Sequence, residues 1–476
     1  MKKPELLVPA GSLTRLKTAI LYGADAVYCG TPSMSLRAKS KFTLEEVLEG
    51  IEFAHSRNKK VYLTVNLFAH NSDIQKLPEY LDVLKQTKPD GVIVADPAIF
   101  LYLRQNAPEL NLHVSTQASV VSWLGVKFWE DLGAKMCVLA RELSFDEIRE
   151  IRAKCPNIKL ETFIHGAMCM SYSGRCLLSN YFTGRGANQG KCAHSCRWNY
   201  KVHLKLKEDI SKEILLNNDT KELFDFLLEE ETRPNDFLEI EETEHGSYLL
   251  NSKDLCLLPV LPEFLQIGVD CLKIEGRNKT QYYAGMVART YRKAIDDYFE
   301  NPEKWNYNKY LDELYTISNR GFSLAFAHES PTDLANNYGM TKSLSEYEFA
   351  GYVESWGNDY INVAVKNRID AGDELEFISP VDDKIIKLTI NEFINSKTDE
   401  ITTVVHAGQD PVIKIPLEWF DRINMTKEKI MLNLPPLTLI RKKKALTDEE
   451  MNRIKKDKTS FKEEILNGNN EDCCNK

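Results

Sequence analysis

Short runs of β-branched and other apolar residues alternate with amphipathic stretches through the first third of the chain. The apolar runs predict strands over residues 5–9, 26–30, 61–66, 91–95, 113–116, 136–140 and 160–164. The amphipathic stretches predict helices over 12–22, 44–56, 74–86, 98–105, 121–132 and 145–154. Several of these helices begin with capping residues, as at Ser12, at Thr43 ahead of Glu46 and at Ser144 ahead of Glu147.

This alternation predicts parallel strands that are joined by right-handed helical crossovers. An eighth strand is expected over 270–275, after a helix over 255–267, and a helix over 282–300 closes the side of the domain. Eight such units favour an α/β fold of the TIM-type (β/α)8 barrel. A doubly wound open sheet is the competing fold, but no G-x-G-x-x-G motif follows the first strand.

The pattern of the chain changes after residue 300. We assign residues 1–300 to the barrel, with an insertion at 168–249, and residues 301–349 to a linker or lid. Short alternating runs with Gly and Asp turns predict a small antiparallel β-barrel domain over 350–441. The charged composition of 442–476 predicts a tail that is partly disordered.

In a barrel of this type, active groups lie at the carboxyl ends of the strands. The polar residues expected there are Asn66, Asp96, Gln117, Arg141, Glu161, His165, Glu275 and Arg277. Glu161 is a candidate for orienting a substrate or, alternatively, a buried structural carboxylate. Glu275 and Arg277 suit the capture of an anion, or an ion pair with each other or with the cysteine segment. His165 is either a proton donor or a hydrogen-bonded core histidine.

Four cysteines lie within the predicted insertion, with the spacing C-x6-C-x15-C-x3-C: Cys169, Cys176, Cys192 and Cys196. Four thiolates gathered by loops suit an iron–sulfur cluster or zinc. The irregular spacing favours a [4Fe-4S] cluster, because zinc sites prefer closely spaced pairs of cysteines. Cys256, at the start of the last barrel helix, is an alternative to Cys196 as fourth ligand, and unliganded thiols are the third possibility.

The chain has 11 cysteines but no signal peptide, so a disulfide framework is not expected. No apolar run approaches about 18 residues, so we expect a cytoplasmic protein without a membrane partner. The net charge of −9 excludes a molecule that is basic as a whole.

Two local sets of residues are compatible with RNA binding. They are the basic residues Arg185, Lys191, Arg197 and 441–444, and the aromatic residues Tyr172, Tyr181, Phe182 and Trp198. Phosphates bind to clustered cations, and unpaired bases stack on aromatic rings. A solvated basic face and ordinary aromatic packing are the alternatives.

Residues 161–179, with the sequence ETFIHGAMCMSYSGRCLLS, resemble the signature of the collagenase-like U-32 peptidase family. The same family is matched by PELLVPAGSLTRLKTAILYGADAVYCG, by NQGKCAHSCRW and by NSKDLCLLPVLPEFLQIGVDCLKIEGR. The resemblance spans most of residues 4–300, and the C-terminal domain resembles the barrel that is appended in longer members.

The resemblance implies a cluster-carrying protein that supports hydroxylation without oxygen. The chain is most similar to the branch of the family that helps to make 5-hydroxyuridine at the wobble position of tRNA. The implied partners of that branch are tRNA and prephenate or a derived small molecule. By the same resemblance, Cys169, Cys176 and Cys192 are matched ligand positions.

Two functions of other classes stay open. One is a collagenase-like peptidase, for which a thiol needs a neighbouring histidine. The motifs H-E-x-x-H and G-x-S-x-G are absent from the sequence, which excludes the zinc and serine hydrolases that these motifs mark. The other is a zinc-stapled scaffold that binds RNA without catalysis.

Overall fold

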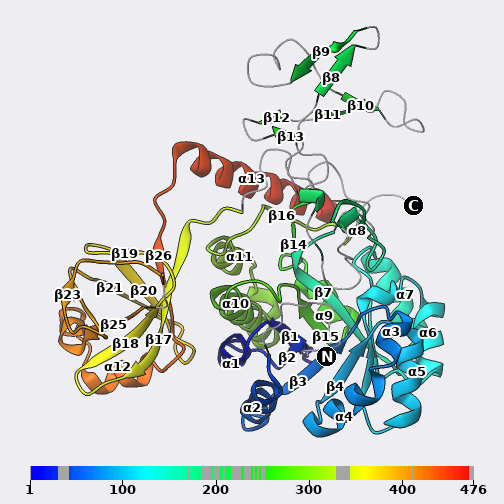
Figure 1. The fold of residues 1–476 in the computed structure, drawn as a ribbon, viewed down its shortest axis with the longest axis horizontal. Helices are drawn as coiled ribbons and strands as arrows, with labels where there is room; N and C mark the ends of the chain where they lie inside the picture. Colours follow the sequence, from blue (N-terminus) through cyan, green and yellow to red (C-terminus); the bar gives the residue numbers. More distant parts are fainter. Residues whose placement is uncertain are drawn as a thin grey trace.

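The computed structural model describes residues 2–30, 42–169, 171–176, 178–183, 192, 195–197, 203–206, 209–215, 227–229, 237–239, 242–243, 246–247, 252–328, 343–408 and 411–470. A barrel of strands wrapped by helices forms the larger part, and a smaller β domain lies beside it (Figure 1). Among the helices of the described ranges, none has the length and apolar character needed to cross a membrane.

Eight parallel strands close the barrel. They are β1 (Glu5–Ala10), β2 (Ala26–Gly30), β3 (Lys60–Val65), β4 (Gly91–Val94), β5 (Leu112–Val114), β6 (Met136–Val138), β7 (Lys159–Ala167) and β15 (Cys271–Ile274). Each strand pairs with the next in the order given, and β15 pairs in parallel with both β7 and β1. The predicted TIM-type barrel is therefore confirmed, and the open doubly wound sheet is excluded.

Helices cover the outside of the barrel, and most of them follow the predicted pattern. They are α1 (Leu13–Leu21), α2 (Leu44–His55), α3 (Asn71–Ile74), α4 (Leu77–Thr87), α5 (Pro97–Asn106), α6 (Trp123–Asp131), α7 (Phe145–Lys154), α9 (Leu261–Ile267) and α10 (Gln281–Glu300). Ser12 accepts from the Arg15 amide, and complete capping boxes begin α2 and α7, as their sequences predict.

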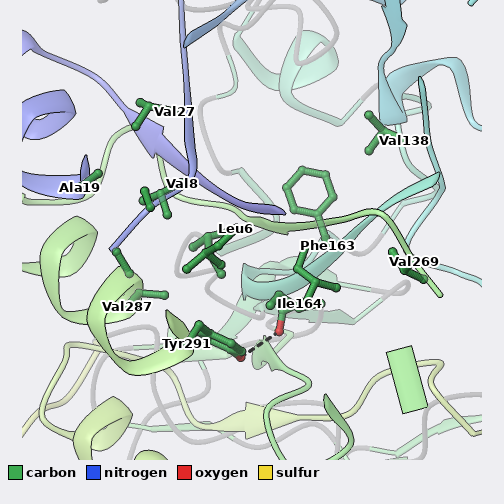
Figure 2. Close-up of a cluster of buried hydrophobic side chains, with 14 of the residues drawn as sticks. Leu6, Val8, Ala19, Val27, Val138, Phe163, Ile164, Val269, Val287 and Tyr291 are labelled. Atoms are coloured by element: carbon green, nitrogen blue, oxygen red, sulfur yellow. Dashed lines mark hydrogen bonds between the residues drawn. The ribbon is translucent and has the colours of Figure 1, made fainter. Parts of the chain in front are cut away.

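The main apolar core lies between strands and helices. Figure 2 shows Leu6 and Val8 of β1 together with Val287 and Tyr291 of α10, all of them buried. The Tyr291 hydroxyl donates to the Ile164 carbonyl of β7 at 3.1 Å, which ties α10 to the barrel wall. A second, smaller cluster on alternate strand positions fills the barrel interior, and it includes Leu7, Tyr28 and Tyr62.

The helix predicted over 255–267 begins later than expected. Residues Asp254–Cys256 form strand β14, which pairs antiparallel with the end of β7 and parallel with β16 (Phe322–Ser323). Strand β7 runs past the barrel to Ala167, and its last backbone groups need hydrogen-bond partners that β14 supplies. Cys256 therefore lies in a strand and not at the start of a helix.

The insertion leaves the barrel after β7, hence at the carboxyl end of the strands. Its described elements are α8 (Leu178–Thr183), η3 (Ser195–Arg197), β8 (His203–Leu206), β9 (Asp209–Leu215), β10 (Leu227–Glu229), β11 (Phe237–Glu239), β12 (Glu242–Thr243) and β13 (Gly246–Ser247). The hairpins β8–β9, β10–β11 and β12–β13 extend away from the barrel (Figure 1).

The second domain is a curled antiparallel sheet of eight strands, as the alternating pattern predicts. In spatial order the strands are β21 (Ile385–Thr389), β20 (Glu374–Ile378), β26 (Leu439–Lys443), β17 (Tyr347–Trp356), β18 (Tyr360–Val365), β25 (Val412–Pro416), β22 (Phe393–Asn395) and β23 (Ile401–Thr402). The short pair β19 (Ile369–Asp370) and β24 (Val404–Val405), with η7 (Leu417–Ile423) and α12 (Lys427–Asn433), completes the domain. The hydroxyl of Tyr22, the residue that caps the end of α1, accepts from the Leu439 amide at 2.8 Å, which joins the domain to the barrel.

Two segments differ from the predicted linker and tail. Residues 301–328 pack on the barrel through η5 (Pro302–Lys304) and α11 (Asn308–Tyr315). Helix α13 (Asp448–Asn470) returns from the small domain and crosses the barrel (Figure 1), where Phe461 and Ile465 are buried. Helix α13 is rich in charged residues, but a narrow stripe of apolar residues at helical spacing packs it on the barrel. The last six residues of the predicted tail lie outside the described part of the chain.

Candidate functional site

Glu161 lies inside the barrel and not at the carboxyl end of its strand. It is the third residue of β7 and pairs in register with Cys271 of β15. Its carboxylate is 2.6 Å from Nζ of Lys273, and the two side chains are 0% and 5% exposed. The prediction that Glu161 lies at the barrel mouth is wrong, because β7 continues six residues beyond it. The buried structural carboxylate considered from the sequence matches this placement, with Lys273 as its partner.

Two aromatic rings lie between this ion pair and the mouth of the barrel. The ammonium of Lys273 lies 4.5 Å from the ring centroid of Tyr28 and 5.3 Å from that of Phe163. The guanidinium of Arg141, which follows β6, lies 4.6 Å from the Phe163 ring, and that of Arg277, which follows β15, lies 5.9 Å from the Tyr28 ring. The rings therefore form a floor that separates the buried ion pair from the arginines at the strand ends.

Four residues converge where β2, β3 and β15 approach their carboxyl ends, and we call them the mouth group: Tyr28, Thr64, Glu275 and Arg277. Tyr28 is the third residue of β2, and its hydroxyl reaches the end of β15. Arg277 Nη1 donates to the Thr64 hydroxyl at 2.8 Å. The Tyr28 hydroxyl lies 2.9 Å from the Ile274 carbonyl and 3.3 Å from a carboxylate oxygen of Glu275. Glu275 and Arg277 thus lie where the sequence predicted them, within reach of a group that enters the barrel.

Gly11 allows the segment after β1 to pass close to the backbone of Arg277. A Cβ atom on Gly11, just after β1, would lie 2.2 Å from the carbonyl oxygen of Arg277. Only glycine allows the two segments to approach so closely. The backbone that presents Arg277 is therefore fixed by the segment that follows the first strand.

Other predicted residues at the mouth divide into two classes. Asp96 is structural, because its carboxylate caps α5 through the amides of Ala98 and Ile99 and also accepts from the Ala69 amide. In contrast, Asn66, Gln117 and Arg141 each have a buried side-chain atom without a hydrogen-bond partner in the described structure: Oδ1, Oε1 and Nε, respectively. Buried polar atoms of this kind are uncommon and are candidates for binding a ligand.

The loop that joins the first two predicted ligand cysteines rests on the barrel mouth. The Glu142 carboxylate accepts from the Ser173 amide at 2.8 Å and from the Ser173 hydroxyl at 3.1 Å. Gly174 has a φ of +77°, and a Cβ atom there would lie 2.3 Å from the Gln117 carbonyl oxygen. Arg141 Nη1 also donates to the last carbonyl of β7 at 2.6 Å. The loop is therefore fixed to the segments that follow β5 and β6.

The four predicted ligand cysteines differ in exposure. Cys169 is exposed, whereas Cys176, Cys192 and Cys196 are half-buried. Within the part of the chain that the structure describes, no three His, Cys, Asp or Glu side chains are arranged to hold a metal ion. The thiols have the right chemistry for a soft metal, but this structure does not place them as a ligand set, so we derive no reaction step from a cluster.

Cys256 has a different environment from the other four thiols. Its side chain is fully buried, and its sulfur lies 3.9 Å from the hydroxyl of Tyr291. Burial raises the pKa of the Cys256 thiol to about 12, which favours the neutral form. Cys256 thus lies in the packed core on β14, apart in sequence from the loop that carries Cys169 and Cys176.

His165 lies in an aromatic cluster. Its Nδ1 atom is 3.4 Å from the hydroxyl of Tyr291, and its ring packs near those of Tyr283 and Phe322. Burial lowers the pKa of His165 to about 4, so the imidazole is neutral at physiological pH. This placement agrees with the core histidine considered as an alternative, and it does not favour a proton donor.

Two of the four residues of the basic run at 441–444 are buried in ion pairs, whereas Lys443 is exposed. Arg441 is buried and lies 2.7 Å from a carboxylate oxygen of Glu376, and Lys442 lies 2.7 Å from Asp373. The prediction of RNA binding by these two residues is wrong, because strand β26 places them within the small domain. Four further residues of the predicted RNA-binding sets, or their side chains, lie outside the described residues: Arg185, Lys191, Arg197 and Trp198.

Sequence reasoning did not single out Tyr28, Thr64 or Lys273. All three lie at alternate positions of apolar strands and face the barrel interior. A polar or aromatic residue on the inward-facing set of a buried strand is a signal that could have found them. The sequence CLKI, with one lysine in an otherwise apolar strand, carries that signal most clearly.

Comparison with known proteins identifies relatives over most of the chain. A family model described as peptidase family U32 matches residues 11–337, and one described as the C-terminal domain of that family matches residues 345–426. The tRNA hydroxylation protein P of Haemophilus influenzae is 37% identical over 452 residues, which cover 91% of this chain and 96% of the relative.

Two further relatives have different names. The tRNA hydroxylation protein P1 of Bacillus subtilis is 39% identical over 383 residues, which cover 80% of this chain and 84% of the relative. An uncharacterized protease of Methanocaldococcus jannaschii is 39% identical over 329 residues, which cover 68% of this chain and 72% of the relative.

Proposed function

The chain belongs to peptidase family U32. We propose that it is a component of the enzyme system that hydroxylates uridine in tRNA, and that it acts in the cytoplasm. The observation that carries this proposal is the similarity to a tRNA hydroxylation protein over nearly the full length of both chains. Both domains are included in that similarity, so the small β domain belongs to the same functional unit.

The geometry of the barrel mouth supports a reaction on a nucleotide. Arg277 is a fixed guanidinium at the mouth, and a guanidinium recognises a phosphate or carboxylate oxygen well. The Asn66 and Gln117 oxygens are acceptors that suit the N–H of a pyrimidine. We therefore assign the target base, and the anionic small molecule of the prephenate class that the family resemblance implies, to this mouth.

The modification we propose is 5-hydroxyuridine at the wobble position, formed without oxygen. We further propose that Cys169, Cys176, Cys192 and Cys196 bind a [4Fe-4S] cluster, with zinc as the alternative metal. The position of the cysteine loop on the ends of β5 and β6 is consistent with a metal centre beside the mouth. The proposal concerns the ligands only.

No observation in the described structure favours the peptidase alternative. A thiol protease needs a cysteine that is activated by a histidine. Cys256 pairs in register with His165 across β14 and β7, but burial raises the pKa of the thiol and lowers the pKa of the imidazole, so neither forms the charged pair that a thiol protease uses. His194 lies outside the described residues.

The test is nucleoside mass spectrometry of tRNA from a strain that lacks the gene and carries a plasmid copy. We expect the wild-type copy to restore 5-hydroxyuridine, and Cys169→Ser, Cys176→Ser and Cys192→Ser to abolish it. Cys155→Ala is a control, because this thiol lies at the end of α7, where its sulfur contacts the Trp123 carbonyl. Unchanged 5-hydroxyuridine in all three serine variants would exclude the proposed role of the cysteines.

Metal analysis of the protein purified without oxygen distinguishes the iron–sulfur protein from the zinc-containing scaffold. Iron with inorganic sulfide supports the cluster, whereas zinc alone supports the scaffold. Cys196→Ser and Cys256→Ser then identify the fourth ligand, because only the variant of a true ligand loses metal. We expect the loss with Cys196→Ser.

A further inference from the structure

Helix α8 carries two adjacent aromatic rings on its solvent side. Tyr181 is 84% exposed and Phe182 is 46% exposed. The two ring centroids are 5.3 Å apart, and the ring planes meet at 80°. Ser179 of the same helix is buried, and its carbonyl accepts from the Thr183 hydroxyl at 2.7 Å. The hydrogen bond lies within the helix, and the burial of Ser179 shows that one side of α8 is covered while the rings are exposed.

These rings border the candidate site. Helix α8 begins two residues after Cys176, directly beyond the loop that Glu142 and Gly174 fix to the barrel mouth. In Figure 1 the helix lies at the end of the barrel from which the insertion leaves. The same loop carries exposed Tyr172 and exposed Arg175. Three aromatic rings and a guanidinium therefore lie on one short segment beside the mouth.

We infer that Tyr181 and Phe182, together with Tyr172, form a stacking surface for unpaired bases of an RNA strand whose target base enters the barrel mouth. This inference rests on the proposed function. Enzymes that act on a base must remove it from its stack, and the neighbouring bases then need a surface to replace the lost stacking. Aromatic side chains supply such a surface for single-stranded nucleic acid, irrespective of its sequence.

The charge beside the rings favours RNA over a protein partner. Arg175 lies one residue before Cys176 and is exposed, so it can reach a phosphate of the strand while the rings contact its bases. An exposed tyrosine also suits this role because its ring can stack while its hydroxyl stays in water. The surface therefore matches a chain of bases and phosphates.

The test is fluorescence anisotropy of the full-length protein with a short RNA hairpin that has an unpaired, uridine-containing loop. We expect the double variant Tyr181→Ala/Phe182→Ala to bind the hairpin more weakly, by roughly fivefold or more for each ring removed. Tyr181→Phe keeps the ring and should bind as the wild type does. Phe128→Ala is the matched control, because Phe128 on α6 is 54% exposed and lies on another face of the barrel.

A second RNA and a folding measurement complete the design. A fully paired duplex of the same length offers no unpaired base, so its affinity should be the same for the wild type and the double variant. Circular dichroism should also be the same for both proteins, because the two rings are solvent-facing and their removal leaves the buried side of α8 intact.

Each outcome decides the inference. Equal affinity of the wild type and the double variant for the hairpin overturns the stacking surface but leaves tRNA hydroxylation standing, because nucleoside analysis measures hydroxylation separately. A wild-type protein that neither binds nor modifies tRNA removes the proposed function and this inference together. If hairpin affinity is unchanged but the mass of the protein in solution falls in the double variant, the rings are a protein contact and the inference is wrong.

Discussion

Deep in the barrel, Glu161 and Lys273 form a buried ion pair, whereas at the mouth Arg277 and Glu275 lie beside the hydroxyls of Thr64 and Tyr28. The two regions are separated by little more than the rings of Tyr28 and Phe163. The deep pair is closed to solvent and stabilises the interior only as a unit. One oxygen of the Glu161 carboxylate has no further partner in the described structure, and the same is true of the Asn66 and Gln117 oxygens beside the mouth. Depth along the strand, and not residue type, thus separates structural charge from candidate binding groups.

The largest effect should come from removing one member of the deep pair. Lys273→Met leaves the Glu161 carboxylate buried without its partner, so we expect the free energy of unfolding to fall by about 3–5 kcal/mol. Urea denaturation, followed by circular dichroism, measures this loss. The double variant Lys273→Met/Glu161→Leu should recover most of it, because no unpaired charge is left in the interior.

A surface pair is the control for this measurement. Lys127 forms an exposed ion pair with Glu130 on α6, so Lys127→Met should leave the free energy of unfolding nearly unchanged. If the double variant at the deep pair is as unstable as Lys273→Met alone, the loss comes from packing, and the interpretation of the deep pair as a mutually neutralised unit is wrong.

The second effect depends on pH and concerns the buried imidazole of His165. Burial lowers the pKa of His165 to about 4 in the folded protein, while the charges of Asp254 and Lys279 act in opposite directions on it. As the pH falls below about 6.5, the unfolded chain takes up a proton at this side chain before the folded chain does. Stability that is fully present above pH 6.5 is therefore lost toward pH 4, by about 3 kcal/mol.

His165→Phe isolates this contribution, because phenylalanine fits an aromatic cluster and does not titrate. We expect the loss of unfolding free energy between about pH 8 and pH 4 to be smaller in the variant by about 3 kcal/mol. The pH-dependence that remains includes His113, since burial also lowers the pKa of that side chain, to about 3. Equal pH-dependence in the two proteins would mean that His165 is accessible and not a core residue.

The same contrast in depth explains what the sequence could predict. Local alternation of apolar and polar residues placed all eight barrel strands, because each strand carries its own pattern. Depth along a strand depends on where the strand ends. Glu161 is the second residue of the predicted strand 160–164 and the third of β7, so the strand pattern itself places it in the interior, and residue type alone suggests the mouth.

Partners that are distant in the sequence account for the other differences. Cys256 lies in β14 because the overhanging end of β7 needs an antiparallel partner, and no local pattern carries that information. Arg441 and Lys442 read as a basic run, yet their acidic partners Glu376 and Asp373 lie more than 60 positions away. The charged composition of 442–476 predicts at most partial helix, because it outweighs the apolar stripe by which α13 packs on the barrel.

The smallest effect on stability, and the sharpest test of the comparison, comes from two matched tyrosines in the barrel interior. Tyr62 donates to Glu5 away from the mouth, whereas Tyr28 donates to the Ile274 carbonyl and lies 3.3 Å from Glu275 at the mouth. Each change to phenylalanine removes one hydroxyl and should cost about 1 kcal/mol of unfolding free energy. Because only Tyr28 belongs to the mouth group, only Tyr28→Phe should reduce the 5-hydroxyuridine content of tRNA. Equal loss of the modified nucleoside in both variants would show that depth in the barrel does not separate structural from binding residues.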